Sequence, residues 1–362
     1  MSINRISKAH SVSSRESHRG EEDIIVLGGG IGGLSVGYHL LKRDCEAFRV
    51  YESQSQIGGL ARSFRWHDTD CDLAPHRLFS ENKAVLNELL GLVECNKITR
   101  RSEIVLDGKR IEDPINIIQL LRVNSPFRSL GLVSSYLWAK LTPDRALHSF
   151  DDFVNNAYGE ALNTLFFKPY AEKLLGIETH NIAAAWGTRK LRVSGLKEVV
   201  RKNSKLYFDY FYYPKNGGYG AFSSRLGEQI KHKIQTQFEL EKIIYHEAEE
   251  RYECQFRDKK GRLISRTSKV LISTLPLPKL LNFIGHSLKL TYRKLRLIYL
   301  HVNLEKVMDQ QWVYFIDQDT MMNRVSEFKN FYPSHHIQVL RYCASKSPPT
   351  RNAPARQWLT NL

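Results

Sequence analysis

The residues of this sequence whose types and spacing suit chemistry begin at a cluster of glycines. Gly28, Gly30 and Gly33 follow a short apolar run that ends at Leu27. A helix-like apolar pattern starts at Leu34. In a strand–turn–helix context, the first glycine permits the turn, the second lets a pyrophosphate approach the backbone, and the third allows close helix–strand packing. The free N–H groups of the helix start would bind the phosphates. The spacing therefore predicts a dinucleotide site.

An acidic residue follows the glycines at the distance that such a site requires. Residues 48–52 form a second strand-like run that ends in Glu52, about 20 residues past the glycines, where a carboxylate accepts hydrogen bonds from a ribose. Gly58, Gly59 and Arg62 come directly afterwards. They would supply backbone donors and a fixed cation for a cofactor longer than NAD. A solvated loop with an incidental arginine is the alternative.

These two glycine segments together resemble the FAD-binding start of the amine oxidase, protoporphyrinogen oxidase, carotenoid desaturase and UDP-galactopyranose mutase superfamily. The resemblance implies FAD as the cofactor. It also implies an α/β fold, in which a Rossmann-like FAD-binding domain of the GR2 type carries an inserted helical and mixed-sheet substrate domain. In this pattern Glu52 would hold the adenosine ribose, and Leu240 would pack on the adenine. The cofactor-binding residues implied are Gly28, Gly30, Ile31, Gly33, Glu52, Ser53, Gly59, Leu60, Ala61, Arg62 and Leu240.

Further segments resemble the mutase branch of this superfamily and imply substrate residues. His76 follows Pro75 as in a Gly-Pro-His segment that passes near the flavin, although Ala74 replaces the glycine. His76 is therefore the candidate catalytic residue. A loop histidine bonded to a backbone carbonyl is an equal alternative.

Three other positions are candidate substrate-binding residues. Tyr170 belongs to a Tyr-x-x-Lys-x-Trp-Gly-like segment, in which Leu175 stands at the tryptophan position. Tyr219 lies between glycines at a strand-to-helix junction, which suggests close backbone approach to a ligand. Arg324 matches an Asn-Arg-Val-x-Glu segment whose arginine faces substrate phosphates in the mutase branch, and a guanidinium suits phosphate. An Arg324–Glu327 pair is the alternative.

Composition bounds the class of protein. The 362 residues suffice for two domains, and 42% hydrophobic and 25% charged residues are ordinary for a soluble globular chain. The net charge of +15 favours anionic partners: a phosphate-bearing substrate, a membrane surface or nucleic acid. Nucleic acid ranks last, because no basic run is interleaved with aromatic residues. Five scattered cysteines indicate reduced thiols and a cytoplasmic protein.

The chain order predicts the following division. Residues 1–22 and 341–362 would be disordered tails, 23–80 and 205–285 the FAD-binding domain, and 81–204 and 286–340 the substrate domain. An Asp-Gly pair predicts a hairpin turn at Asp107. The apolar helix over 127–140 is expected to pack in a core, and peripheral contact with a membrane is left open.

The resemblance covers residues 22–331 and then stops, which suggests a truncated chain with an out-of-frame tail after about His336. The expected function is that of an FAD-dependent oxidoreductase or flavin-dependent mutase acting on a small, phosphate-bearing substrate such as a nucleotide sugar. Two alternatives stay open: a protoporphyrinogen-oxidase- or desaturase-like dehydrogenase of an apolar substrate, and an inactive truncated FAD-binding protein. No metal site is predicted. The sequence leaves the electron acceptor and the oligomeric state undetermined.

Overall fold

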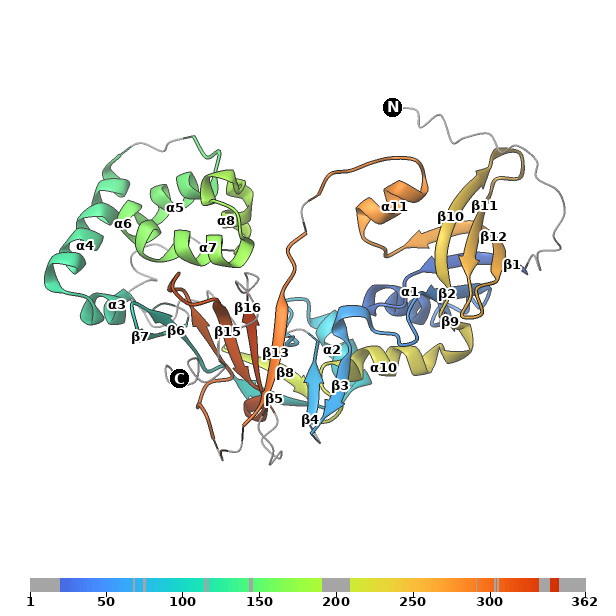
Figure 1. Ribbon diagram of the computed structural model, residues 1–362, viewed down its shortest axis with the longest axis horizontal. Coiled ribbons are helices and arrows are strands. Elements are labelled where there is room, and N and C mark those ends of the chain that lie inside the picture. The colour runs from blue at the N-terminus through green and yellow to red at the C-terminus, as the bar shows by residue number, and fades with distance from the viewer. Residues whose placement is uncertain are drawn as a thin grey trace. The chain divides into compact units, whose positions relative to one another are not determined.

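The computed structural model describes residues 20–67, 69–73, 76–113, 115, 117–142, 146–190, 209–290, 292–302, 304, 306–331 and 339–344. The chain divides into two compact units (Figure 1). Unit 1 comprises residues 1–66, 70–96 and 213–292, and unit 2 comprises residues 67–69, 97–212 and 293–362. Both units are therefore assembled from segments that lie far apart in the sequence.

Unit 1 is built on a six-stranded sheet with the order β10-β11-β12-β1-β2-β9. The strands are β1 (Gly20–Leu27), β2 (Phe48–Glu52), β9 (Ile234–Thr236), β10 (Glu239–His246), β11 (Arg251–Arg257) and β12 (Leu263–Ser273). Strands β12, β1, β2 and β9 pair in parallel, and β10 and β11 add antiparallel strands. Ile25 and Leu27 pack on one side of β1 and Val26 on the other, all almost fully buried, as a central parallel strand requires.

The helices and smaller strands of unit 1 position the glycine turns. They are α1 (Ile31–Leu41), the short helix η1 (Gly59–Ala61), β3 (Ser63–Trp66), β4 (Thr69–Asp72), α2 (Lys83–Leu92), α10 (Gly220–Gln229), η4 (Lys231–Lys233), η5 (Glu247–Glu249) and α11 (Leu277–Phe283). The Asn82 side chain caps α2 by accepting hydrogen bonds from the N–H groups of Ala84 and Val85. Residues 81–96, assigned to the substrate domain from the sequence, lie in unit 1, because α2 packs against α10.

Unit 2 contains a second six-stranded sheet with the order β13-β16-β15-β14-β6-β7. Its strands are β6 (Ser102–Leu106), β7 (Lys109–Glu112), β13 (Arg296–His301), β14 (Trp312–Phe315), β15 (Met322–Glu327) and β16 (Val339–Ala344). The hairpin predicted at the Asp-Gly pair joins β6 to β7, with positive φ angles at Asp107 (50°) and Gly108 (69°). A separate two-stranded sheet pairs β5 (Cys95–Thr99) with β8 (Tyr210–Pro214).

Helices form the second layer of unit 2, around a core of Leu, Ile, Val and Phe side chains. They are α3 (Ile117–Val123), α4 (Pro126–Leu141), α5 (Phe150–Tyr158), α6 (Glu160–Leu162), the π-helix η2 (Asn163–Phe167), α7 (Lys168–Leu175), η3 (Thr179–Asn181), α8 (Ala184–Lys190) and η6 (Phe328–Phe331). Ser149 and Asp152 form a capping box at the start of α5.

Further boundaries differ from the sequence prediction. Residues 209–212, expected in the FAD-binding domain, lie in unit 2, and residues 286–290, expected in the substrate domain, lie in unit 1. Strand β1 starts at Gly20, inside the expected N-terminal tail, because Gly20 continues the parallel register by pairing with Arg266. The prediction of disorder from residue 341 is wrong for residues 341–344. These residues belong to β16, which is hydrogen-bonded on both sides, to β13 and β15. Residues 1–19 and 345–362 lie outside the described residues.

Candidate functional site

Two glycine turns abut at the carboxyl ends of β1 and β2. Gly58 N–H donates to Gly29 O (2.8 Å), and Gly30 and Gly58 form a parallel bridge. A Cβ placed on Gly59 would lie 3.2 Å from Gly30 Cα, so a side chain there would crowd the first turn. Helix α1 starts here with Gly30 as its N-cap and without a side-chain cap. Its first N–H groups therefore remain donors for an anion.

The Glu52 carboxylate is bound to the first glycine turn. Gly29 N–H donates to Glu52 Oε2 (2.7 Å), and Gln54 N–H donates to Glu52 Oε1 (2.8 Å). The Glu52 side chain is 9% exposed, and the Ser53 hydroxyl donates to it at 3.3 Å. The predicted ribose acceptor thus lies at the edge where the ends of parallel strands bind nucleotides.

The glycine spacing has steric reasons that the structure makes explicit. A Cβ on Gly33 would lie 1.9 Å from Gly28 O, and a Cβ on Gly28 would lie 2.5 Å from Thr274 Oγ1. Gly28 also has φ +102°, which disfavours other residues. The first turn therefore holds α1 against β1 as closely as a dinucleotide site requires.

The other predicted cofactor residues occupy varied surroundings. Ile31 begins α1, and Ala61 is buried in η1, whereas Leu60 is 77% exposed. Arg62 is half-buried and ends η1. Leu240 is 8% exposed and packs in the core cluster of β10 and β11.

His76 and Tyr219, two predicted site residues far apart in the sequence, lie together in unit 1. Their rings stack with centroids 4.8 Å apart. His76 Nε2 lies 3.0 Å from Leu60 O, which agrees with the alternative of a loop histidine bonded to a backbone carbonyl. Burial, followed by the negative charge of Asp72, raises the pKa of Tyr219, so its hydroxyl stays protonated at neutral pH.

Asp72 holds the Tyr219 loop and was missed by the sequence analysis. Its carboxylate accepts hydrogen bonds from the Tyr213 hydroxyl (2.6 Å), the Ser63 hydroxyl (2.6 Å) and Tyr219 N–H (2.8 Å). Gly220 N–H in turn donates to Ser63 Oγ (2.8 Å). The Asp72 side chain is buried, with 1% exposed. In the sequence, Asp72 is one of several polar residues around Cys71, and nothing in their pattern predicts that it binds the distant Tyr219 loop.

In unit 2, Tyr170 and Arg324 both contact Tyr314. The Tyr170 and Tyr314 rings meet edge to face at 6.0 Å, and the Arg324 guanidinium lies 5.7 Å from the centroid of Tyr314. Arg324 Nη2 is buried and has no hydrogen-bond partner among the described residues. Glu327 lies three residues along β15, on the opposite face, where it accepts a hydrogen bond from Met308 N–H (2.9 Å). The alternative Arg324–Glu327 pair is therefore not formed.

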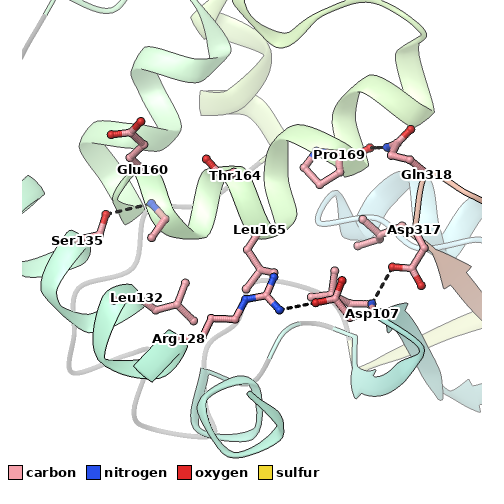
Figure 2. A pocket seen from close by; sticks show the side chains of 14 residues that line it. Asp107, Arg128, Leu132, Ser135, Glu160, Thr164, Leu165, Pro169, Asp317 and Gln318 are labelled. Carbon is pink, nitrogen blue, oxygen red and sulfur yellow. Dashed lines mark hydrogen bonds and ion pairs between the residues drawn. The ribbon is translucent and has the colours of Figure 1, made fainter. Parts of the chain in front are cut away.

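A cavity of about 680 Å³ lies next to this group in unit 2 (Figure 2). Arg128 pairs with Asp107 there, and Asp317 accepts from the N–H groups of Asp107 and Gly108. Lys173 Nζ, only 3% exposed, donates to Asp317 O (2.6 Å). The charged side chains of the wall are thus largely engaged with the protein itself.

Within the described residues, no cluster of His, Cys, Asp and Glu could hold a metal ion. No helix among them is long and apolar enough to cross a membrane.

Comparisons with known proteins agree with this geometry. Residues 26–91, which include both glycine turns, match the family described as NAD(P)-binding Rossmann-like domain. Protein anon-37Cs of Drosophila melanogaster is 25% identical over 190 residues, which are 51% of this chain and 34% of that protein. The chain thus spans about a third of the length of this curated relative.

Solved structures match a larger share of this chain than the curated relative does. A reduced UDP-galactopyranose mutase has a TM-score of 0.77 at 19% identity, with 90% of this chain and 75% of that chain covered. A candidate protoporphyrinogen oxidase from Exiguobacterium sp. 255-15 has a TM-score of 0.69 at 13% identity, with 90% and 77% covered. The chain therefore shares the fold of these solved structures, and the predicted α/β architecture with a Rossmann-like domain is confirmed.

Proposed function

We propose that this chain is a flavoenzyme that binds FAD in unit 1 and acts on a small, phosphate-bearing substrate such as a nucleotide sugar. The observation that carries the proposal is the hydrogen bond from Gly29 N–H to the Glu52 carboxylate. The second glycine turn contacts the same first turn through the bridge between Gly30 and Gly58. The neighbouring solved structures share this fold, and they include a reduced UDP-galactopyranose mutase. When bound, FAD would supply the hydride-accepting or nucleophilic centre.

The residues of unit 1 fit the adenosine diphosphate half of that cofactor. The uncapped N–H groups of α1 would bind the pyrophosphate, and Glu52 would accept hydrogen bonds from the adenosine ribose. Arg62 would add a fixed positive charge. Side chains larger than hydrogen at Gly30 and Gly59 would narrow the gap between the two turns, where a pyrophosphate needs backbone contact.

Each unit, taken by itself, contains a candidate substrate-binding side chain. In unit 1, the neutral Tyr219 hydroxyl is a hydrogen-bond donor. Asp72 fixes the Tyr219 backbone by accepting from its N–H, and the Tyr219 ring stacks on His76. Arg324 offers a buried Nη2 without a partner in the described part of the chain, and a phosphate oxygen would satisfy that donor. An unsatisfied buried donor costs free energy, so its presence favours an anionic ligand.

Cofactor binding is tested first. The purified chain, reconstituted with FAD and freed of excess, should hold bound flavin whose absorbance bleaches on addition of dithionite. Glu52→Gln should weaken FAD binding about ten- to a hundredfold, because a ribose hydroxyl loses a charged acceptor. Glu241→Gln, which removes an exposed carboxylate paired with Arg257, is the matched control and should bind normally. Failure of wild type to take up FAD would refute the flavoenzyme proposal.

The substrate class is tested on the FAD-loaded protein. UDP should bind, and Arg324→Gln should weaken UDP binding about ten- to a hundredfold, because a charged hydrogen bond to phosphate is lost. Arg110→Gln on β7 is the control, since Arg110 is exposed and pairs with Glu103. Turnover of UDP-galactose by the reduced enzyme would support the mutase-like assignment. Turnover of a porphyrinogen or a polyene without UDP binding would contradict the phosphate-bearing substrate while leaving the flavoenzyme intact.

A further inference from the structure

Helix α4 lies at the edge of unit 2 (Figure 1), and most of the side chains that it exposes to solvent are apolar. The large apolar side chains of this face are Phe127, Leu130, Val133, Leu137, Trp138 and Leu141, with exposed fractions of 89%, 68%, 41%, 50%, 67% and 81%. Their spacing is three or four residues except at the adjacent pair Leu137 and Trp138, and it places all six on one side of the helix, together with the small residue Ser134. We call this set the α4 face.

The opposite side of α4 accounts for the packing of the helix. Leu132 is 7% exposed and belongs to the core cluster of unit 2. Figure 2 shows Leu132, Arg128 and Ser135 along the wall of the cavity. The helix is thus anchored by one side, and the α4 face is not needed to hold it in place. A water-facing side of a helix is ordinarily polar, so an apolar α4 face calls for a partner.

The charged residues in the stretch of sequence that carries the α4 face are all positive. Between Pro114 and Pro143 the sequence contains Arg122, Arg128 and Lys140 and no Asp or Glu. Arg128 pairs with Asp107, and Lys140 lies over the Tyr136 ring, 5.4 Å from its centroid. An apolar stripe that ends in aromatic and leucine side chains and has cations beside it is typical of helices that lie in a membrane interface.

We propose that the α4 face docks on the surface of an anionic lipid bilayer. The helix would lie in the plane of the interface with Phe127 and Trp138 inserted among the acyl chains, and Arg122 and Lys140 near the lipid headgroups. The net charge of +15 supplies the long-range attraction to such a surface.

The charge beside the α4 face favours an anionic bilayer over a second copy of the chain. A second copy would bring the same cations, Arg122 and Lys140, against the face, and two chains of net charge +15 repel each other. Insertion by about 5–10 Å into the interface needs only one amphipathic helix.

Sedimentation with vesicles tests the proposal on the full chain. Wild type should pellet with vesicles made of equal parts phosphatidylcholine and phosphatidylserine, and far less with phosphatidylcholine alone. Leu137→Ser should lower the partition coefficient about tenfold. Leu263→Ser is the matched control, because Leu263 on β12 is 52% exposed, against 50% for Leu137, and lies outside the face. Equal binding of both variants, or equal binding to both lipid mixtures, would overturn the proposal.

Trp138 provides a second measurement that does not depend on substitution of the leucines. Its fluorescence should shift to shorter wavelength when anionic vesicles are added and be quenched by brominated acyl chains, and Trp138→Phe should abolish most of that change. Sedimentation velocity without lipid provides the opposing outcome. A dimer that Leu137→Ser dissociates, in a protein that ignores vesicles, would assign the α4 face to a second copy and overturn the bilayer proposal.

Discussion

Replacement of Gly33 by alanine tests the steric reason for the glycine turn. The new Cβ would lie 1.9 Å from Gly28 O, whereas ordinary contact begins at 3.4 Å, so α1 and the end of β1 would have to separate by about 1.5 Å. Overpacking against backbone typically costs about 1–3 kcal/mol, and more where neither side can yield. We expect Gly33→Ala to lower the free energy of unfolding by at least about 2 kcal/mol.

The adjacent glycine provides the matched control. A Cβ on Gly32 would meet Thr274 Cγ2 at 3.6 Å, an ordinary contact, and alanine is the better helix former by about 1 kcal/mol. Gly32→Ala should therefore be neutral or stabilising. Urea unfolding followed by circular dichroism measures both variants, and flavin uptake reports the site itself. Equal stability of the two variants would refute the argument that Gly33 is required by its distance from Gly28 O.

Substitutions at three other positions give further expectations. Asp152→Asn removes a charged acceptor of the α5 capping box, in which the hydrogen bond from the Ser149 side chain lowers the pKa of Asp152. Wild type should therefore be about 1 kcal/mol more stable than the variant above pH 3.8. This difference should be lost as the pH falls through the folded-state pKa of Asp152. Glu327→Gln should change stability with the opposite dependence on pH, because burial raises the pKa of Glu327. At neutral pH the ionised wild type should be less stable than the variant. The thermal unfolding temperatures of the two proteins should converge below pH 4.5. Asp72→Ala should destabilise unit 1 by about 3 kcal/mol or more, because three buried donors lose their acceptor. Asp72→Asn keeps an oxygen for Ser63 and Tyr219 and should destabilise unit 1 less. Equal losses of stability in urea unfolding would contradict the role of the Asp72 network.

The glycine turn and its acid could be predicted from the sequence because their requirements are local. A tight turn, a close helix–strand contact and a carboxylate at the next strand end are each fixed within one strand–helix–strand unit, so spacing alone indicates them. The positions of Gly28, Gly33 and Glu52 bear this out. The resemblance to known families added the two-domain arrangement, and the solved structures confirm a shared fold.

Contacts between distant segments left no such signal. Asp72 and Tyr219 are 147 residues apart, and a hydrogen bond across that distance depends on how strands β3, β4 and β8 come together. The same holds for Tyr314, which meets Tyr170 and Arg324 but matched no motif. Strand β16 was missed because Val339–Ala344 runs directly into residues rich in Ser, Pro and Arg, which favoured a disordered tail, whereas hydrogen bonds to strands on both sides fix this segment.

Helix α4 shows where periodicity reaches its limit. The spacing of its apolar residues predicted the helix, and packing of that stretch in a core was the expectation. That expectation is right for Leu132 and wrong for Leu130, Leu137 and Trp138, because a helix of this composition is apolar on more than one side and only the fold decides which side is covered. The uncovered side has the composition of a core but the exposure of a surface. That mismatch makes the α4 face, more than the charge of the chain, the feature from which an external partner can be argued.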